Sequence, residues 1–88
     1  VDFADIPAVE REMMFVKVQA EGPMRGEILR TVEIFRCKVV DVSSNEMTIE
    51  ATGDQNKLDA ILSLLQRFGI KELARTGAVA MRRSKKTD

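Results

Sequence analysis

Residues 67–81 organise the rest of this chain, and they read Arg-Phe-Gly-Ile-Lys-Glu-Leu-Ala-Arg-Thr-Gly-Ala-Val-Ala-Met. It completes a helix and turns at Gly69, because the left-handed residue that follows a helix is least strained as glycine. It then continues as an extended segment of mostly small, apolar residues, which another element must cover. Gly77 inside that segment is expected to mark a bulge or a close approach of two backbones.

The residues before this stretch predict a helix with one buried face, because apolar side chains recur at spacings of three and four. That stripe consists of Leu58, Ile61, Leu62, Leu65 and Phe68. Asp54 stands in front of it and is expected to cap the helix by accepting a hydrogen bond from an early backbone N–H. A second, weaker stripe follows Pro23 and predicts a helix over residues 23–35. Its members are Met24, Ile28, Leu29, Val32 and Phe35.

Three further segments have the pattern of strands. Residues 12–20 and 46–52 alternate between apolar and polar side chains, and residues 37–43 are rich in valine. The core side of the first strand is expected to hold Met14, Val16, Val18 and Ala20. The second and third strands are joined by Ser43-Ser44-Asn45, a composition typical of a turn, and so form a hairpin.

The order strand, helix, strand, strand, helix, strand predicts an α+β, ferredoxin-like βαββαβ fold. A four-stranded antiparallel sheet would carry both helices on one face. The other face would stay uncovered, and it is predicted to carry Met13, Phe15, Val39, Thr48 and Val79. Such an apolar surface is expected to be covered by a second copy or another domain.

Composition fits one globular domain: 88 residues, 44% hydrophobic, 32% charged, with 14 basic and 14 acidic side chains. We assign residues 1–10 to a linker from an upstream domain, 11–82 to the ferredoxin-like domain and 83–88 to a basic tail. The balanced charge gives no reason to expect a nucleic-acid partner. No apolar run reaches the roughly 20 residues of a membrane span.

The chemistry-bearing residues are few. Histidine is absent, and the one cysteine, Cys37, is expected to be a small core or strand-edge residue. A helix start at Gly22-Pro23 resembles the anion site of a small phosphatase, but no partner group accompanies it, and Phe15 alone does not make an RNA-binding surface. We therefore predict no catalytic, cofactor-binding or metal residue. Arg75 has two open interpretations, a surface arginine on an edge strand or an arginine that pairs with a partner carboxylate.

Four stretches together resemble a known family. They are Phe-Gly-Ile-Lys-Glu-Leu-Ala-Arg-Thr-Gly at 68–77, Val-Glu-Arg-Glu-Met-Met at 9–14, Ile-Phe-Arg-Cys-Lys-Val-Val-Asp-Val-Ser at 34–43 and Thr-Ile-Glu-Ala-Thr-Gly-Asp at 48–54. In order and spacing they resemble the C-terminal domain of the regulatory, or small, subunit of acetolactate synthase (acetohydroxyacid synthase). The resemblance extends from about Val9 to Met81.

The resemblance implies a non-catalytic regulatory subunit that helps activate the catalytic, or large, subunit and transmits feedback inhibition by valine in branched-chain amino-acid biosynthesis. It implies a homodimer whose effector binds mainly to a preceding ACT-type domain. Thiamine diphosphate, Mg²⁺ and FAD are then expected only on the catalytic partner. The compartment would be the cytoplasm, or the plastid stroma in a photosynthetic eukaryote. Candidate partner or dimer contacts are Met13, Phe15, Val39, Thr48, Arg75, Thr76 and Gly77. The alternative is a stand-alone small-ligand sensor of the same fold.

Overall fold

The computed structural model describes residues 8–82 of the chain. Its elements are β1 (Ala8–Gln19), α1 (Met24–Ile34), β2 (Lys38–Val42), β3 (Glu46–Gly53), α2 (Gln55–Leu65), the 3₁₀ turn η2 (Gln66–Phe68), β4 (Ile70–Arg75) and β5 (Val79–Arg82). The basic tail at 83–88 and residues 1–7 of the predicted linker lie outside the described residues.

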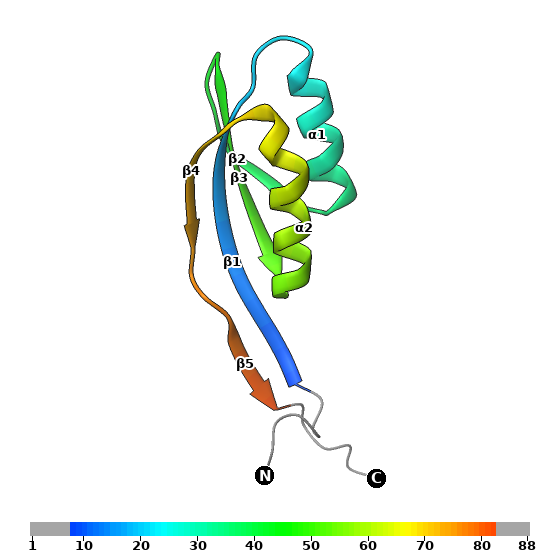
Figure 1. Ribbon diagram of the computed structural model, residues 1–88, viewed down its shortest axis with the longest axis vertical. Helices are drawn as coiled ribbons and strands as arrows, with labels where there is room; N and C mark the ends of the chain where they lie inside the picture. Colours follow the sequence, from blue (N-terminus) through cyan, green and yellow to red (C-terminus); the bar gives the residue numbers. More distant parts are fainter. Residues whose placement is uncertain (1–7, 83–88) are drawn as a thin grey trace.

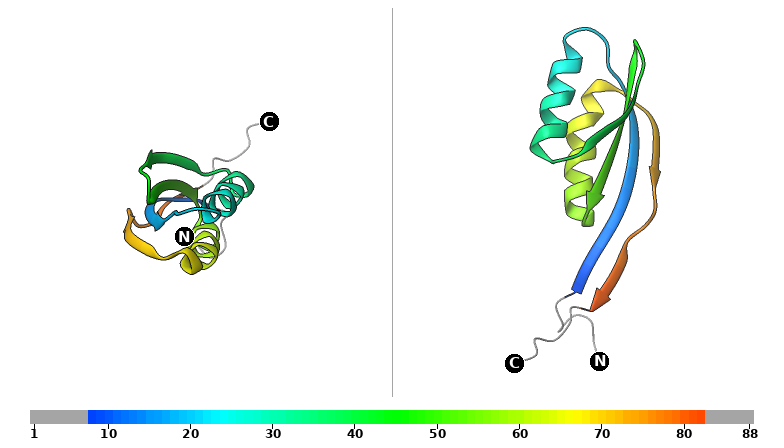
Figure 2. Two further views of the ribbon diagram at one scale, coloured as in Figure 1. Left: turned by 90° about the horizontal axis from the view of Figure 1, so that it is seen from above. Right: turned by 180° about the vertical axis from the view of Figure 1, so that it is seen from behind.

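The sheet has the predicted ferredoxin-like arrangement. Its strands follow the order β2-β3-β1-β4, every neighbouring pair is antiparallel, and β5 pairs in addition with the first part of β1. Both helices cover the same face of this sheet (Figures 1 and 2). We call that face the inner face and the opposite one the outer face.

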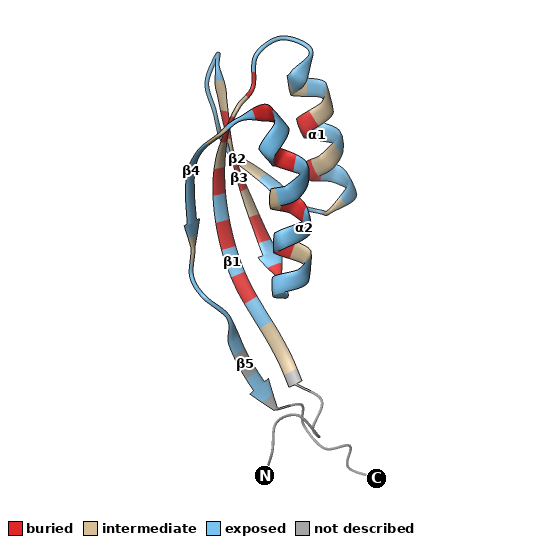
Figure 3. Ribbon diagram, viewed as in Figure 1, coloured by how far each residue is buried: buried red, intermediate tan, exposed pale blue. Residues whose placement is uncertain are grey.

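The core lies between the inner face and the helices, and in Figure 3 buried residues recur along β1, β3 and both helices, separated by exposed ones. Alternation along β1 sends its even-numbered side chains inward, as predicted, since successive side chains of a strand point to opposite faces. The buried apolar residues are Met14, Val16, Val18, Ala20, Ile28, Val32, Met47, Ile49, Ala51, Leu58, Ile61, Leu65 and Phe68. The predicted stripe of α2 is therefore confirmed, with Leu62 only partly buried at its margin.

Local signals at the ends of α2 and in the hairpin turn are also confirmed. Asp54 caps the helix by accepting a hydrogen bond from the backbone N–H of Lys57 at 2.8 Å. The hydroxyl of Ser43 accepts from the N–H of Glu46 at 3.1 Å and so closes the turn between β2 and β3. Gly69 follows η2 with a φ of +91°, the left-handed region that favours glycine.

Two predictions of side-chain direction are wrong. In α1 only Ile28 and Val32 are buried, whereas Met24 and Leu29 are exposed. Leu29 follows Ile28 by one residue and so lies about 100° further around the helix, outside the row that meets the sheet.

Val39 does not lie on the outer face, where the sequence predicts it, but packs against the core. The register pairs Val39 with the buried Ile49 and Asp41 with Thr48, and it shifts between these two pairs. In a regular strand the side chains of Val39 and Asp41 would point to the same face. The extra residue of the bulge places them on opposite faces, so Val39 points inward although Asp41 points outward.

The last strand is divided, and the first is longer than predicted. Strand β1 begins at Ala8, four residues before the predicted start, because β5 supplies a partner for residues 8–11. The ribbon formed by residues 8–11 and 79–82, which we call the arm, continues past the N-terminal end of α2 (Figure 1). We call the rest of the described residues the body.

A bulge separates β4 from β5. Met14 pairs with Arg75 and Arg11 pairs with Val79, so two residues of β1 face three residues of the other strand. Gly77 lies in the middle of these three with a φ of +84°. The sequence-based expectation of a bulge at this glycine is confirmed.

We expect Gly77→Ala to lower the free energy of unfolding by about 1–2 kcal/mol, because the left-handed conformation is strained for residues with a Cβ. A Cβ there would meet no atom within 4 Å, so the loss would come from backbone strain alone. The matched control is Gly26→Ala within α1, which should stabilise the chain by roughly 0.5–1 kcal/mol. Urea denaturation of both variants tests this, and equal effects would contradict it.

Candidate functional site: the outer face and the Glu12 cluster

A charged side chain stands in the row of β1 that otherwise builds the core. Glu12 has the inward parity of Met14 and Val16 and is only 5% exposed. A buried carboxylate is costly unless it is paired and hydrogen-bonded. Arg75, the last residue of β4, supplies the pair: its Nε donates to Glu12 Oε2 at 3.0 Å and its Nη2 donates to Oε1 at 2.6 Å. This two-pronged geometry is the strongest that an arginine and a carboxylate make.

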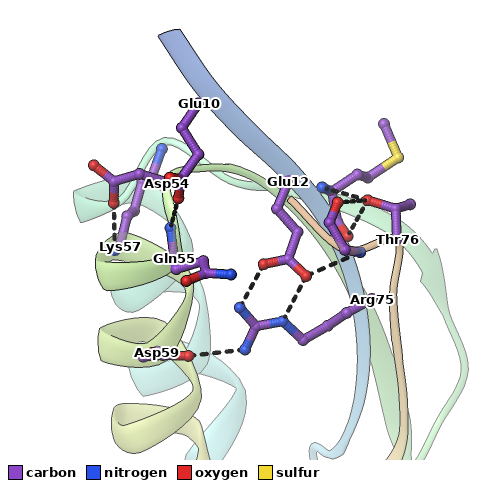
Figure 4. Close-up of polar contacts among 10 residues, drawn as sticks. Glu10, Glu12, Asp54, Gln55, Lys57, Asp59, Arg75 and Thr76 are labelled. Carbon is purple, nitrogen blue, oxygen red and sulfur yellow. Dashed lines mark hydrogen bonds and ion pairs between the residues drawn. The ribbon is translucent and has the colours of Figure 1, made fainter. Parts of the chain in front are cut away.

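Two more groups complete the cluster, which Figure 4 shows between the sheet and α2. The backbone N–H of Gly77 donates to Glu12 Oε2 at 3.1 Å. On its other side, Arg75 Nη1 donates to Oδ1 of Asp59 on α2 at 2.8 Å. We call Glu12, Arg75, Asp59 and the Gly77 amide the Glu12 cluster.

The charges of the cluster stabilise one another. The hydrogen bonds from Arg75 lower the pKa of the Glu12 carboxyl, and the charge of Arg75 and the Gly77 amide add to this, while burial acts in the opposite direction. The hydrogen bonds that Arg75 donates to Glu12 and to Asp59 raise the pKa of Arg75, so the pair is ionised at neutral pH.

Thr76 closes the bulge from the other strand. Its backbone N–H donates to the carbonyl of Met13 at 3.0 Å, as in a regular strand pair. In the return direction, the N–H of Met13 donates to the Thr76 hydroxyl at 3.1 Å instead of to a backbone carbonyl. The Thr76 hydroxyl thus replaces a backbone carbonyl as the acceptor. The carbonyl that would accept in a regular strand pair belongs to the peptide that is rotated at Gly77.

The outer face has an apolar part and a charged part. Met13 and Phe15 are 38% and 37% exposed there, and the register places Val79 and Met81, 65% and 69% exposed, on the same side along the arm. Further from the arm, Lys17 Nζ lies 3.2 Å from Glu72 Oε2, and this pair borders a shallow hollow of about 440 Å³ next to Phe15 and Thr48. The face is therefore not uniformly apolar.

The structure separates the predicted contact residues into two groups. Met13, Phe15 and Thr48 lie on the outer face, and their role as contacts stays a prediction; Val39 does not lie there. Arg75, Thr76 and Gly77 gather at the bulge, where Arg75 pairs with Glu12 and Asp59 of its own chain rather than standing free at the surface. Sequence reasoning missed Glu12 and Asp59, although a glutamate at a core position of a strand is a signal that a buried cation is near.

Among the described residues, the remaining chemical groups form no further site. Cys37 is partly buried, and this burial raises the pKa of its thiol. Within residues 8–82, no three side chains of histidine, cysteine, aspartate or glutamate come together as metal ligands would. In the same range neither helix has the length and apolar character needed to cross a bilayer.

The chain is similar to known proteins over most of its length. A family model described as the small subunit of acetolactate synthase matches residues 11–84. The chain is 57% identical over 83 residues to the acetolactate synthase small subunit of Aquifex aeolicus, covering 93% of this chain and 43% of that protein. It is 50% identical over 84 residues to the chloroplastic acetolactate synthase small subunit 2 of Arabidopsis thaliana, covering 96% of this chain and 18% of that protein.

A solved structure agrees with the fold as well as with the sequence. The crystal structure of an acetolactate synthase small subunit from Thermotoga maritima superposes with a TM-score of 0.83 at 45% sequence identity, over 89% of this chain and 48% of that one. The chain thus spans less than half of the length of each of these three relatives. The family model, the identities and the shared fold agree, and the chain belongs to the family of acetolactate synthase small subunits.

Proposed function

We propose that the chain serves as the C-terminal domain of a non-catalytic regulatory subunit of acetolactate synthase, a thiamine-diphosphate-dependent enzyme. In this role it helps to activate the catalytic subunit. It also helps to transmit feedback inhibition by a branched-chain amino acid, and the effector that we propose is valine. The observation that carries the proposal is the 57% identity to a protein named acetolactate synthase small subunit over 93% of the chain.

The proposal places the other components on other parts of the assembly. The catalytic subunit would hold thiamine diphosphate, Mg²⁺ and FAD. The binding site for the effector amino acid would lie mainly in a preceding ACT-type domain. The compartment would be the cytoplasm, or the plastid stroma in a photosynthetic eukaryote, a setting supported by the chloroplastic names of two plant relatives.

A chimaera tests the regulatory role directly. The segment of the Aquifex aeolicus small subunit that matches this chain is replaced by the chain and mixed with the catalytic subunit of that organism. We expect the chimaera to raise the rate of acetolactate formation above that of the catalytic subunit alone and to make the rate sensitive to valine. A chimaera with a native circular dichroism spectrum that changes neither property would overturn the proposal.

The outer face is the surface that we propose for homodimer formation. Met13, Phe15, Val79 and Met81 expose apolar area on one side of the sheet and arm, and an apolar surface of this kind is typical of interfaces. We expect Phe15→Lys to shift the chain from dimer to monomer in sedimentation velocity, because a dimer would bury the added charge. The matched control is Leu29→Lys, which adds the same charge at an exposed leucine on the helix side. Monomer for the unmodified chain, or equal effects of the two variants, would count against this surface.

The hollow beside Phe15 favours a second candidate, in which the chain senses a small ligand on its own. Lys17 and Glu72 border it with opposite charges, which suits a zwitterion. Isothermal titration of valine into the chain alone separates the two functions: heat of saturable binding would support the sensor, and its absence would leave the regulatory domain as the better account.

A further inference from the structure

The body and the arm are supported very differently. Strand β1 passes through both without interruption, but within the body it is flanked by β3 and β4 and covered by the helices. In the arm, residues 8–11 pair with β5. Among the described residues, one side-chain hydrogen bond joins the arm to a helix: the Gln55 N–H at the start of α2 donates to Glu10 Oε1 at 3.4 Å, which is long for a hydrogen bond.

The connection between them is weakened on the strand opposite β1. The bulge interrupts the regular pairing there, and Gly77 has the left-handed conformation that gives a strand a local bend. The N–H of Met13 donates to the Thr76 hydroxyl instead of to a backbone carbonyl. Backbone pairing alone would therefore leave the direction of the arm poorly determined at this point.

The Glu12 cluster spans this weak point. It ties together β1 through Glu12, the end of β4 through Arg75, the bulge through the Gly77 amide, and α2 through Asp59. Three of these four bonds converge on the Glu12 carboxylate, which is almost fully buried, where charged hydrogen bonds are strongest; the fourth joins Arg75 to Asp59. Figure 4 shows Glu12 and Arg75 side by side below the point where β1 enters the arm.

We propose that the Glu12 cluster is a latch that fixes the direction in which the arm leaves the body. Glu12, Arg75 and Asp59 are positioning residues in this proposal, since they act through the backbone that they hold. The latch sets how the arm part of the outer face, with Val79 and Met81, continues from the body part, with Met13 and Phe15. The latch would therefore determine the shape of the outer face that any binding partner contacts.

The test measures the orientation of the arm rather than stability. Spin labels are attached through Ser63→Cys, on an exposed position of α2, and Met81→Cys, on the arm, in a Cys37→Ser background. Electron–electron double resonance then gives the distribution of distances between them. Glu12→Gln removes the charge at the centre of the latch. Asp59→Asn weakens the link to α2 at a side chain that is 65% exposed, so it leaves the core intact. Glu72→Gln, which removes an exposed ion pair of β4, is the control.

We expect the distance distribution to widen at least about twofold in Glu12→Gln and to widen less in Asp59→Asn, while Glu72→Gln leaves it unchanged. Amide exchange should accelerate at least about tenfold in β5 and in residues 8–11 of Glu12→Gln but not in β3. Should Glu12→Gln fail to fold, the Asp59→Asn and Glu72→Gln comparison decides. The proposal is overturned by equal widths in Asp59→Asn and the control, or by acceleration of β3 as large as that of β5.

Discussion

Ile61→Ala is expected to lower the free energy of unfolding by ~2–5 kcal/mol, the range measured for removing large buried aliphatic side chains. Ile61 is 1% exposed and lies in the middle of the buried row of α2, between Leu58 and Leu65. A small domain has a total stability of only about 5–15 kcal/mol, so this single change would remove a large part of the stability of a domain near the lower end of that range. Urea denaturation followed by circular dichroism gives the difference.

The control for this prediction lies on the same helix. Leu64 is 48% exposed, so Leu64→Ala removes a similar volume of hydrocarbon without opening a cavity. It should cost well under 1 kcal/mol, as most surface substitutions do. A loss below half a kilocalorie for Ile61→Ala, or similar losses for both variants, would show that the inner face of α2 is not the core of this domain.

Arg75→Met is expected to destabilise the chain more than Glu12→Gln at neutral pH. It leaves the Glu12 carboxylate buried without a cation, which is the costly way to break a buried ion pair. In Glu12→Gln the amide can still accept a hydrogen bond from Gly77, and Arg75 keeps Asp59. Urea denaturation of both variants at pH 7 compares them, and an equal or reversed order would contradict the account of the cluster.

The same pair has a predicted pH dependence. The folded pKa of Glu12 is lowered, so its contribution to stability is fully present above the ordinary carboxyl pKa of about 4.3 and is lost as pH falls through the lower folded value. In Arg75→Met the carboxylate has no cation and protonates readily. The gap in stability between the parent chain and this variant should therefore shrink as the pH falls from 7 to about 3. Lys17→Met, which removes a partly exposed cation of the outer face, should show a small gap throughout.

Periodic patterns predicted the parts of the fold that depend on local sequence. The helix of α2, its Asp54 cap, the turn at Ser43 and the alternation of β1 each follow from a few neighbouring residues. The direction of Val39 does not, because the bulge in β2 becomes visible only when β2 is paired with β3. The division of the last strand depends likewise on β1, which is distant in sequence.

The candidate site was predicted only in outline. The sequence predicts Arg75, Thr76 and Gly77 as contact residues, because they are polar or small residues in an otherwise apolar strand. Their partner Glu12 lies 63 positions from Arg75 along the chain, and pairing at that distance leaves no periodic trace. Its inward parity, next to Met14, was the one available signal. Asp59 lies on the exposed side of the α2 stripe, where an acidic residue is ordinary.

The central place of β1 has a consequence for how the chain folds during synthesis. The strand at the start of the sequence pairs with residues 46–53, 70–75 and 79–82, so its partners leave the ribosome long after it does. The α1 helix and the β2–β3 hairpin can form earlier from local contacts, but β1 lacks its second neighbouring strand until β4 has emerged. Non-local pairing of this kind slows folding, and the nascent chain would leave one edge of β1 unpaired until about residue 75 emerges.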